Sequence, residues 1–233
     1  MTDPADFPIV RLSSANLPRR DRLALWREHY GRVIHRAEIE LLPGPSFDAA
    51  LVSRALPGLQ AVSEATSGVR VMRTRELVAD GNDDLALVIN RAGIFAACAR
   101  GREVTLREGD AVLVSSSDVA VFYRFSLGGS LSLRMPRAML SSLVVDIDDA
   151  VMRPIPRHTA ALELLTSHAS ALLTGSAPAT SELRRMAVAH MYDLVTLTLG
   201  ASRGTGDVAR TGWVHAADSA QPKLPSSALA VVG

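Results

Sequence analysis

Histidine, cysteine and acidic side chains are the groups in this sequence that would most readily hold a metal ion or attack a substrate. The chain has six histidines, and none lies between Val69 and Met135, the region with the clearest strand pattern. A metal site on adjacent strands would need imidazole or carboxylate ligands at close spacing. Asp110 and Asp118 lie in this region, but we expect both in turns. The sequence therefore predicts no metal site and no cofactor.

Covalent catalysis finds equally little support in the sequence. The only cysteine, Cys98, follows apolar residues, so we expect a small buried side chain and not a nucleophile. The chain contains no Gly-x-Ser-x-Gly motif and no glycine-rich phosphate-binding loop. We predict that it has no catalytic residues and is not an enzyme. A single cysteine also excludes an intramolecular disulfide.

Non-covalent binding of a small molecule is the chemistry that the remaining polar residues suggest. Four of them fall on or beside predicted strands and are candidate ligand-binding residues: Asn90, Arg91, Tyr123 and Arg134. Which of these point into a pocket depends on strand register, because neighbouring residues of a strand face opposite ways. Trp26 and Tyr30 belong to the first predicted helix, and we interpret both as packing residues in preference to pocket residues.

The elements that would position these residues are short strands between residues 69 and 135. Apolar residues recur at every second position from Leu85 to Ile89, and the pattern resumes after Gly93. Turn signals separate the strands, including a tight turn predicted at residues 100–102. This spacing is typical of a β-sandwich or a small barrel. The preceding stretch, interrupted at residues 44–45 and 57–58, is interpreted as loop and strand.

Helical periodicity flanks the strand region on both sides. One helix is predicted over residues 18–34, and two amphipathic helices over 159–174 and 181–199 end at Gly175 and Gly200. The short link between the last two predicts an antiparallel hairpin. Residues 203–233 are rich in small residues and keep no period, so we predict a disordered or weakly ordered tail.

The composition is that of an ordinary globular protein. The 233 residues are 48% apolar and 21% charged, and the net charge is only +1, so no polyanionic partner is required. The N-terminus is acidic and lacks a signal-peptide pattern, and the apolar runs are far shorter than a membrane span. We expect a cytoplasmic protein with no membrane contact.

The order of these parts resembles the N-terminal sensor domain of AraC-type transcriptional regulators. Residues 107–114 look like that family's turn into a barrel strand, residues 133–140 like its exit from the barrel, and residues 190–201 like its last sensor-domain helix. The likeness covers residues 8–202. It implies an α+β fold, in which a small cupin-like β-barrel (a double-stranded β-helix) carries an N-terminal helix and a C-terminal antiparallel helix pair.

The resemblance also implies a role for each part. In that family the barrel binds an effector and the helix pair forms the dimer. We therefore expect the domain at residues 8–202 to bind an unidentified small molecule and to form a homodimer. The expected interface is the apolar stripe of the last helix: Leu183, Met186, Ala187, His190, Met191 and Leu194. We interpret His190 as a satisfied histidine of the interface or the core in preference to a ligand.

The helix-turn-helix domain of such regulators has no counterpart in the 33 residues after Gly200. We expect a truncated regulator that does not bind operator DNA on its own, because base-reading side chains need a helical scaffold. A frameshift near codon 202, which the abrupt loss of periodicity favours, and a natural stand-alone sensor are both open. Two other functions remain: a small cupin enzyme, either a metal-independent isomerase or a dioxygenase, and a partner in inactive heterodimers with a full-length relative.

Overall fold

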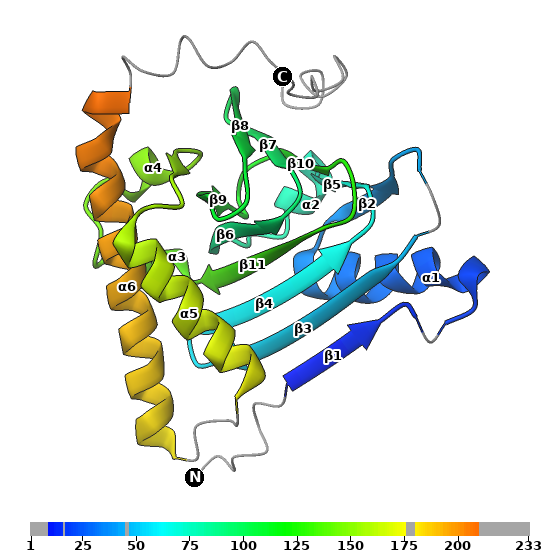
Figure 1. Cartoon of the computed structure of the whole chain (residues 1–233), viewed down its shortest axis with the longest axis horizontal. Helices are drawn as coiled ribbons and strands as arrows, with labels where there is room; N and C mark the ends of the chain where they lie inside the picture. Colours follow the sequence, from blue (N-terminus) through cyan, green and yellow to red (C-terminus); the bar gives the residue numbers. More distant parts are fainter. Residues whose placement is uncertain (1–8, 16, 45–46, 176–179, 210–233) are drawn as a thin grey trace.

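The chain folds as a cupin-like barrel flanked by helices (Figure 1). The computed structural model describes residues 9–15, 17–44, 47–175 and 180–209. Within these ranges the strands form two sheets in which every strand pairing is antiparallel. The larger sheet has the order β1 (Ile9–Ser13), β3 (Ala49–Leu56), β4 (Leu59–Thr66), β11 (Gly128–Met135), β6 (Leu85–Ala92), β9 (Ala111–Ser115) and β12 (Pro154–Ile155). The smaller sheet has the order β2 (Glu38–Leu41), β5 (Val69–Arg73), β10 (Ala120–Arg124), β7 (Phe95–Ala99) and β8 (Arg102–Leu106).

The main helices lie before and after the barrel strands. α1 (Arg19–Trp26) continues into the π-helix η2 (Arg27–His35), and the C-terminal pair consists of α5 (Ala160–Thr174) and α6 (Ser181–Ala209). Three short helices join strands: α2 (Arg75–Val78), α3 (Arg137–Ser141) and α4 (Ile147–Ala150). The predicted α+β cupin-like barrel with its N-terminal helix and C-terminal helix pair is confirmed. The helices predicted at 18–34 and 159–174 are also found, each within one residue of its predicted bounds.

Each barrel strand presents alternate side chains to the space between the sheets and to the outside. In β6, Ala86 and Val88 line that space. Leu85, Leu87 and Ile89 point the other way and are fully buried in the core cluster that also contains residues of α5 and α6. The period-two pattern is therefore confirmed, although both faces of the strand are covered.

The tight turn predicted at residues 100–102 joins β7 to β8. Arg100 and Gly101 have positive φ angles of 52° and 67°. Two consecutive left-handed residues match the twist of the paired strands, as in a type I′ hairpin. Arg100 occupies this position with its guanidinium paired to Asp118 at 2.6 Å and to Asp148 at 2.9 Å.

The strands before residue 69 form more of the barrel than the sequence indicates. β3 and β4 make a hairpin that reverses at Pro57 and Gly58, where Gly58 has a φ of 76°. The Tyr192 hydroxyl of α6 donates a hydrogen bond to the Gly58 carbonyl at 2.7 Å. This contact ties the last helix to the tip of the hairpin, and burial raises the pKa of Tyr192 to about 12.

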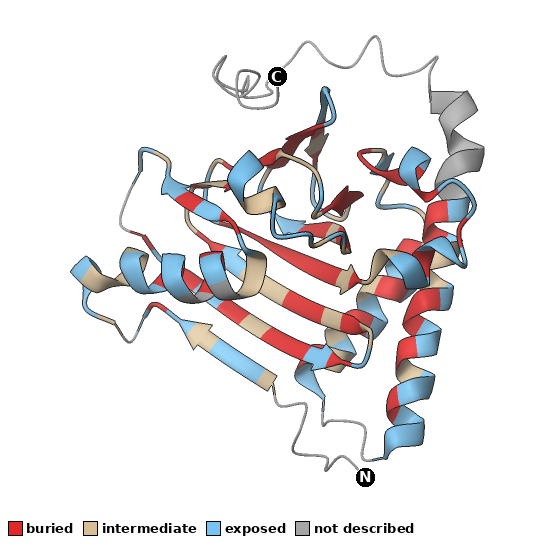
Figure 2. Ribbon diagram, turned by 180° about the vertical axis from the view of Figure 1, so that it is seen from behind, coloured by how far each residue is buried: buried red, intermediate tan, exposed pale blue. Residues whose placement is uncertain are grey.

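Two helical layers cover opposite faces of the larger sheet (Figures 1 and 2). On one face, Trp26 and Tyr30 pack against Leu51 of β3 and Val62 of β4. On the other face, α5 and α6 bury their apolar residues against outward side chains of β11 such as Leu133. In the described ranges no helix is both long and apolar enough to cross a membrane.

The last helix is longer than predicted, because α6 passes through Gly200 and ends at Ala209. A glycine in a helix interior costs about 1 kcal/mol relative to alanine. The turns before Gly200 are anchored by buried Val188, Val195 and Leu199, and each added residue then contributes one backbone hydrogen bond. Residues 203–209, predicted as tail, therefore continue the helix. The remainder of the predicted tail, residues 210–233, lies outside the described residues.

Candidate functional site

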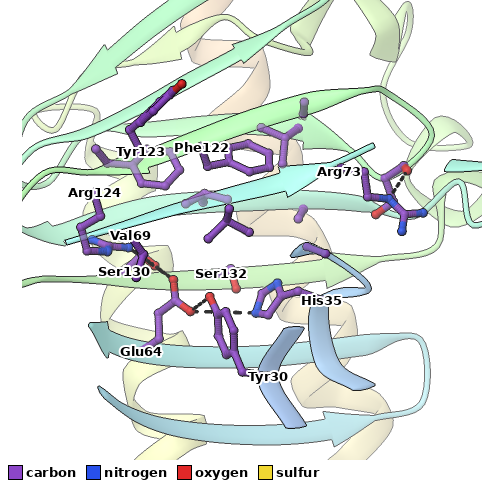
Figure 3. A pocket seen from close by; sticks show the side chains of 18 of the residues that line it. Tyr30, His35, Glu64, Val69, Arg73, Phe122, Tyr123, Arg124, Ser130 and Ser132 are labelled. Carbon is purple, nitrogen blue, oxygen red and sulfur yellow. Dashed lines mark hydrogen bonds and ion pairs between the residues drawn. The ribbon is translucent and has the colours of Figure 1, made fainter. Parts of the chain in front are cut away.

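A cavity of about 100 Å³ lies between the two sheets, and η2 contributes to its wall (Figure 3). This volume is of the same order as that of an engineered apolar cavity of about 150 Å³ that binds benzene. Part of the wall is apolar, formed by the inward side chains of Val69, Val71, Ala86, Val88, Phe95 and Phe122. Polar side chains of the wall include Tyr30, His35, Glu64, Thr66, Arg73, Arg124, Ser130, Ser132 and Arg134.

Glu64 of β4 is the centre of a polar cluster in this cavity (Figure 3). Its Oε1 accepts hydrogen bonds from Ser130 Oγ at 2.7 Å and from Arg124 Nη2 at 3.3 Å. Its Oε2 accepts a hydrogen bond from the Tyr30 hydroxyl and lies 3.9 Å from His35 Nε2. These partners belong to β11, β10 and η2, so one carboxylate links the N-terminal helix to both sheets.

Burial and neighbouring charges set the protonation states of the cluster. Burial raises the pKa of Glu64, but His35, the Arg124 guanidinium and the hydroxyl donors outweigh it and hold that pKa below its usual value. Burial, followed by the charge of Glu64, raises the pKa of Tyr30 well above its usual value. Burial lowers the pKa of His35 to about 4 against the opposing attraction of Glu64. At neutral pH the cluster therefore holds a carboxylate, a protonated phenol and a neutral imidazole.

The neutral state of His35 predicts a loss of stability in acid. An unfolded histidine binds a proton near pH 6.5 and folded His35 only near pH 4, so the unfolded state binds more protons between these values. We expect the free energy of unfolding to fall by about 2–3 kcal/mol as the pH drops through this window. Urea denaturation from pH 7 to pH 4 measures it. The fall in unfolding free energy between pH 7 and pH 4 should be smaller in His35→Gln than in wild type. The control His168→Gln, which replaces an exposed histidine, should show the same fall as wild type. Parallel curves for wild type and His35→Gln would mean that folded His35 binds its proton at the same pH as the unfolded residue.

Two further arginines line the cavity beside the end of η2. Arg73 is buried and pairs with Asp80 at 2.8 Å, and it also donates to two backbone carbonyls. Arg134 donates from Nη1 to the Ile34 carbonyl at 2.6 Å, and its Nη2 lies 3.3 Å from His35 Nδ1. The same histidine therefore lies between Arg134 and the Glu64 cluster.

Of the four predicted ligand residues, Arg134 and Tyr123 are found at the cavity, but they are placed differently. Arg134 occupies an inward position of β11. The ring of Tyr123 stacks on Phe125 at 5.7 Å in a cluster on the other face of β10, and its hydroxyl points away from Glu64 (Figure 3). Adjacent strand residues face opposite ways, so Phe122 takes the inward position that Tyr123 was expected to hold.

Asn90 and Arg91 lie outside the cavity wall. Asn90 is fully buried, and its Nδ2 donates to the carbonyls of Gly93 and Leu106 at 2.8 and 3.2 Å. Its amide therefore holds the turn that follows β6. Arg91 is exposed, and its Nη1 donates to Ser170 Oγ of α5 at 3.0 Å. Neither side chain is placed to contact a molecule in the cavity.

Several cavity residues carry little signal in the sequence. Glu64 occupies an inward position of β4, in a stretch that we interpreted as loop and strand, and the polar character of this inward face hides it from a search for apolar alternation. His35 enters from the end of η2, outside the strand region at residues 69–135 in which we considered histidine ligands. Tyr30 has two roles. Its ring stacks on that of Trp26, with the centroids 4.8 Å apart, and its side chain also lines the cavity.

Cys98 and the acidic and histidine side chains were the groups considered for covalent catalysis and for metal binding. Cys98 is buried on the outer face of the smaller sheet, and burial raises the pKa of its thiol, as expected for a small core residue. Across the described ranges no three His, Cys, Asp or Glu side chains lie together in a group that could hold a metal ion.

Residues 26–200 match the family model of the AraC-binding-like domain. This span contains the barrel strands from β2 onward, η2 and most of the C-terminal helix pair. The chain belongs to the AraC-binding-like domain family. No curated protein matches its sequence significantly.

Among solved structures, this AraC-binding-like domain is similar to the AraC-like transcriptional activator CuxR. The two share 19% sequence identity and a TM-score of 0.70, over 83% of this chain and 70% of CuxR, a likeness that concerns the fold. An RmlC-like cupin from Shewanella frigidimarina shares 17% identity with a TM-score of 0.32, over 43% of this chain and 84% of the cupin.

The last helix of this AraC-binding-like domain has two apolar faces, which divide the predicted interface residues. Met191 is only 1% exposed in the core, where it lies with Val188 and Val195. It therefore does not belong to a surface that a partner could contact. Leu183 and Met186 are 49% and 59% exposed. His190 is also exposed, and Ala187 and Leu194 are half-buried at the edge of this face.

Proposed function

We propose that this chain is the ligand-sensing and dimerisation module of a cytoplasmic AraC-type transcriptional regulator. The observation that carries the proposal is a cavity with apolar and polar walls inside the barrel of an AraC-binding-like domain. Such a pocket, with a few convergent polar groups, suits a small-molecule effector. In this proposal the module binds the effector without converting it, and reading of DNA falls to a separate domain.

Strand β11 supports a coupling between the cavity and the helix pair. Ser130, Ser132 and Arg134 line the cavity, whereas Leu131 and Leu133 between them pack in the core cluster that includes α5 and α6. A ligand that shifts the inward residues of this strand also moves the surface on which the helices rest. Allosteric control requires such a link between the bound ligand and the arrangement of the partner surface.

The outer face of α6 supports dimerisation. Leu183, Met186, His190, Leu194 and Leu197 follow one another at spacings of three, four, four and three residues. At 3.6 residues per turn they form one stripe along the helix. Leu197 is 61% exposed, like Met186, so the stripe presents apolar surface away from the barrel. A second copy of this chain would present the same stripe, as a two-fold symmetric interface requires.

Sedimentation velocity tests the interface with the double variant Leu183→Glu/Met186→Glu. We expect wild type to sediment as a dimer and the double variant as a monomer, because carboxylates placed opposite each other across the dimer axis repel. Both side chains are about half exposed, so the unfolding temperature should stay close to that of wild type.

Leu127→Glu is the matched control, because Leu127 is 70% exposed in the loop between β10 and β11. This variant should sediment as wild type does. A double variant that remains dimeric, or a wild-type chain that is monomeric throughout a concentration series, would contradict dimerisation through this face of α6.

A further inference from the structure

The charges around the cavity do not balance. Glu64 pairs with Arg124, with Nη2 and Oε1 3.3 Å apart, so these two charges cancel. Asp80 pairs with Arg73 at 2.8 Å and also with Arg36 at 3.2 Å. These pairings account for the two carboxylates that lie closest to cavity arginines.

Arg134 is the cavity arginine that no carboxylate of the described residues neutralises. Its two hydrogen-bond partners, the Ile34 carbonyl and His35 Nδ1, are both uncharged at neutral pH. Burial lowers the pKa of Arg134, Asp84 opposes this from a distance, and Arg73 and Arg36 add to the lowering. A guanidinium nevertheless keeps its proton in proteins. The cavity therefore contains one positive charge without a counter-charge.

The free donors of Arg134 suit an anionic group. A guanidinium has five N–H donors, and the two contacts to Ile34 and His35 leave others for a ligand. Two parallel N–H donors match the two oxygens of a carboxylate. In surroundings that exclude most water, the attraction between these charges is stronger than at the surface.

The wall opposite β11 suits an apolar group. Phe122 of β10 points into the cavity (Figure 3). The rings of Phe122 and Phe95 stack with their centroids 6.0 Å apart. Val71 extends this surface on the neighbouring strand β5, and Val88 of β6 adds an apolar side chain from the facing sheet. A cavity of this volume limits the ligand to a small molecule, about one ring in size.

We infer that the cavity binds a small organic carboxylate, with its anionic group on Arg134 and its apolar body against Phe122. The inference rests on the proposed sensing function and names the chemical class of the effector. Benzoate has this shape and charge. Benzamide is its uncharged counterpart of nearly equal size.

Calorimetric titration of the purified chain with benzoate, phenylacetate, hexanoate and benzamide tests the inference. We expect at least one carboxylate to bind, and benzoate to bind more tightly than benzamide. Arg134→Gln should weaken carboxylate binding about 10- to 100-fold, because a hydrogen bond to a charged group contributes about 1.5–3 kcal/mol. Arg91→Gln is the matched control, since it removes an arginine from the same sheet outside the cavity.

The outcomes separate the inference from the proposed function. Benzamide binding as tightly as benzoate, or unchanged carboxylate binding by Arg134→Gln, overturns the anion inference and leaves a sensor for neutral molecules. Failure of the wild-type chain to bind any of the four compounds overturns the carboxylate inference alone, because the proposed sensing function does not require a carboxylate effector. If Arg134→Gln does not fold, the affinities of the wild-type chain for benzoate and benzamide test the inference on their own, and tighter binding of benzoate supports it.

Discussion

Replacing Glu64 with glutamine is expected to lower the free energy of unfolding by about 3–5 kcal/mol. The substitution keeps the size of the side chain but removes the charge that balances Arg124, whose side chain is only 3% exposed. It also weakens the hydrogen bonds from Tyr30 and Ser130, which then reach a neutral acceptor. Urea denaturation at pH 7 measures the difference, with circular dichroism as the signal.

Two further variants identify the cause of that loss. Glu40→Gln is the control, because Glu40 also pairs with an arginine, at 3.0 Å, but its side chain is 52% exposed. Glu40→Gln should lower the free energy of unfolding by no more than about 1 kcal/mol. The double variant Glu64→Gln/Arg124→Gln removes both buried charges and should be more stable than Glu64→Gln alone. A Glu64→Gln variant as stable as Glu40→Gln would show that the ion pair with Arg124 contributes little to the fold.

The barrel and its flanking helices could be predicted because local patterns specify them. The alternation from Leu85 to Ile89 separates the cavity face of β6 from its helix face, and the turn at Arg100 and Gly101 joins two strands through backbone angles that glycine favours. β3 and β4 were harder to recognise. β4 carries polar residues such as Glu64 at inward positions, where the pattern of a half-buried strand expects apolar ones.

The cavity was less predictable than the fold, because its polar groups meet only through tertiary structure. His35 and Glu64 are separated by 29 residues in sequence and approach within 3.9 Å because η2 packs beside β4. Phe122 and not Tyr123 holds the inward position of β10, a difference of one position along the strand. Arg134 was predicted because it falls on an alternating strand, β11, and its position on that strand faces inward.

Helix α6 shows why a stripe of apolar residues does not identify an interface. The predicted stripe mixed two faces, since residues three and four apart share a side of the helix while Met186 and Met191 do not. Met191 faces the barrel, whereas Met186 faces away from it. A helix with apolar residues on both faces can pack on its own domain and on a second chain, and only burial distinguishes the two faces.

Met191→Ala is accordingly expected to cost the monomer about 2–5 kcal/mol, because it removes a side chain that is 99% buried and leaves a cavity beneath α6. Met186→Ala makes the same chemical change on the same helix and should alter the stability of the monomer by less than about 0.5 kcal/mol. Urea denaturation at protein concentrations low enough to dissociate a dimer compares the two. If Met186→Ala were the more destabilising of the two under those conditions, the assignment of the buried and exposed faces of α6 would be reversed. A larger loss for Met191→Ala, together with weaker self-association of Met186→Ala, would assign one face to the core and the other to the partner.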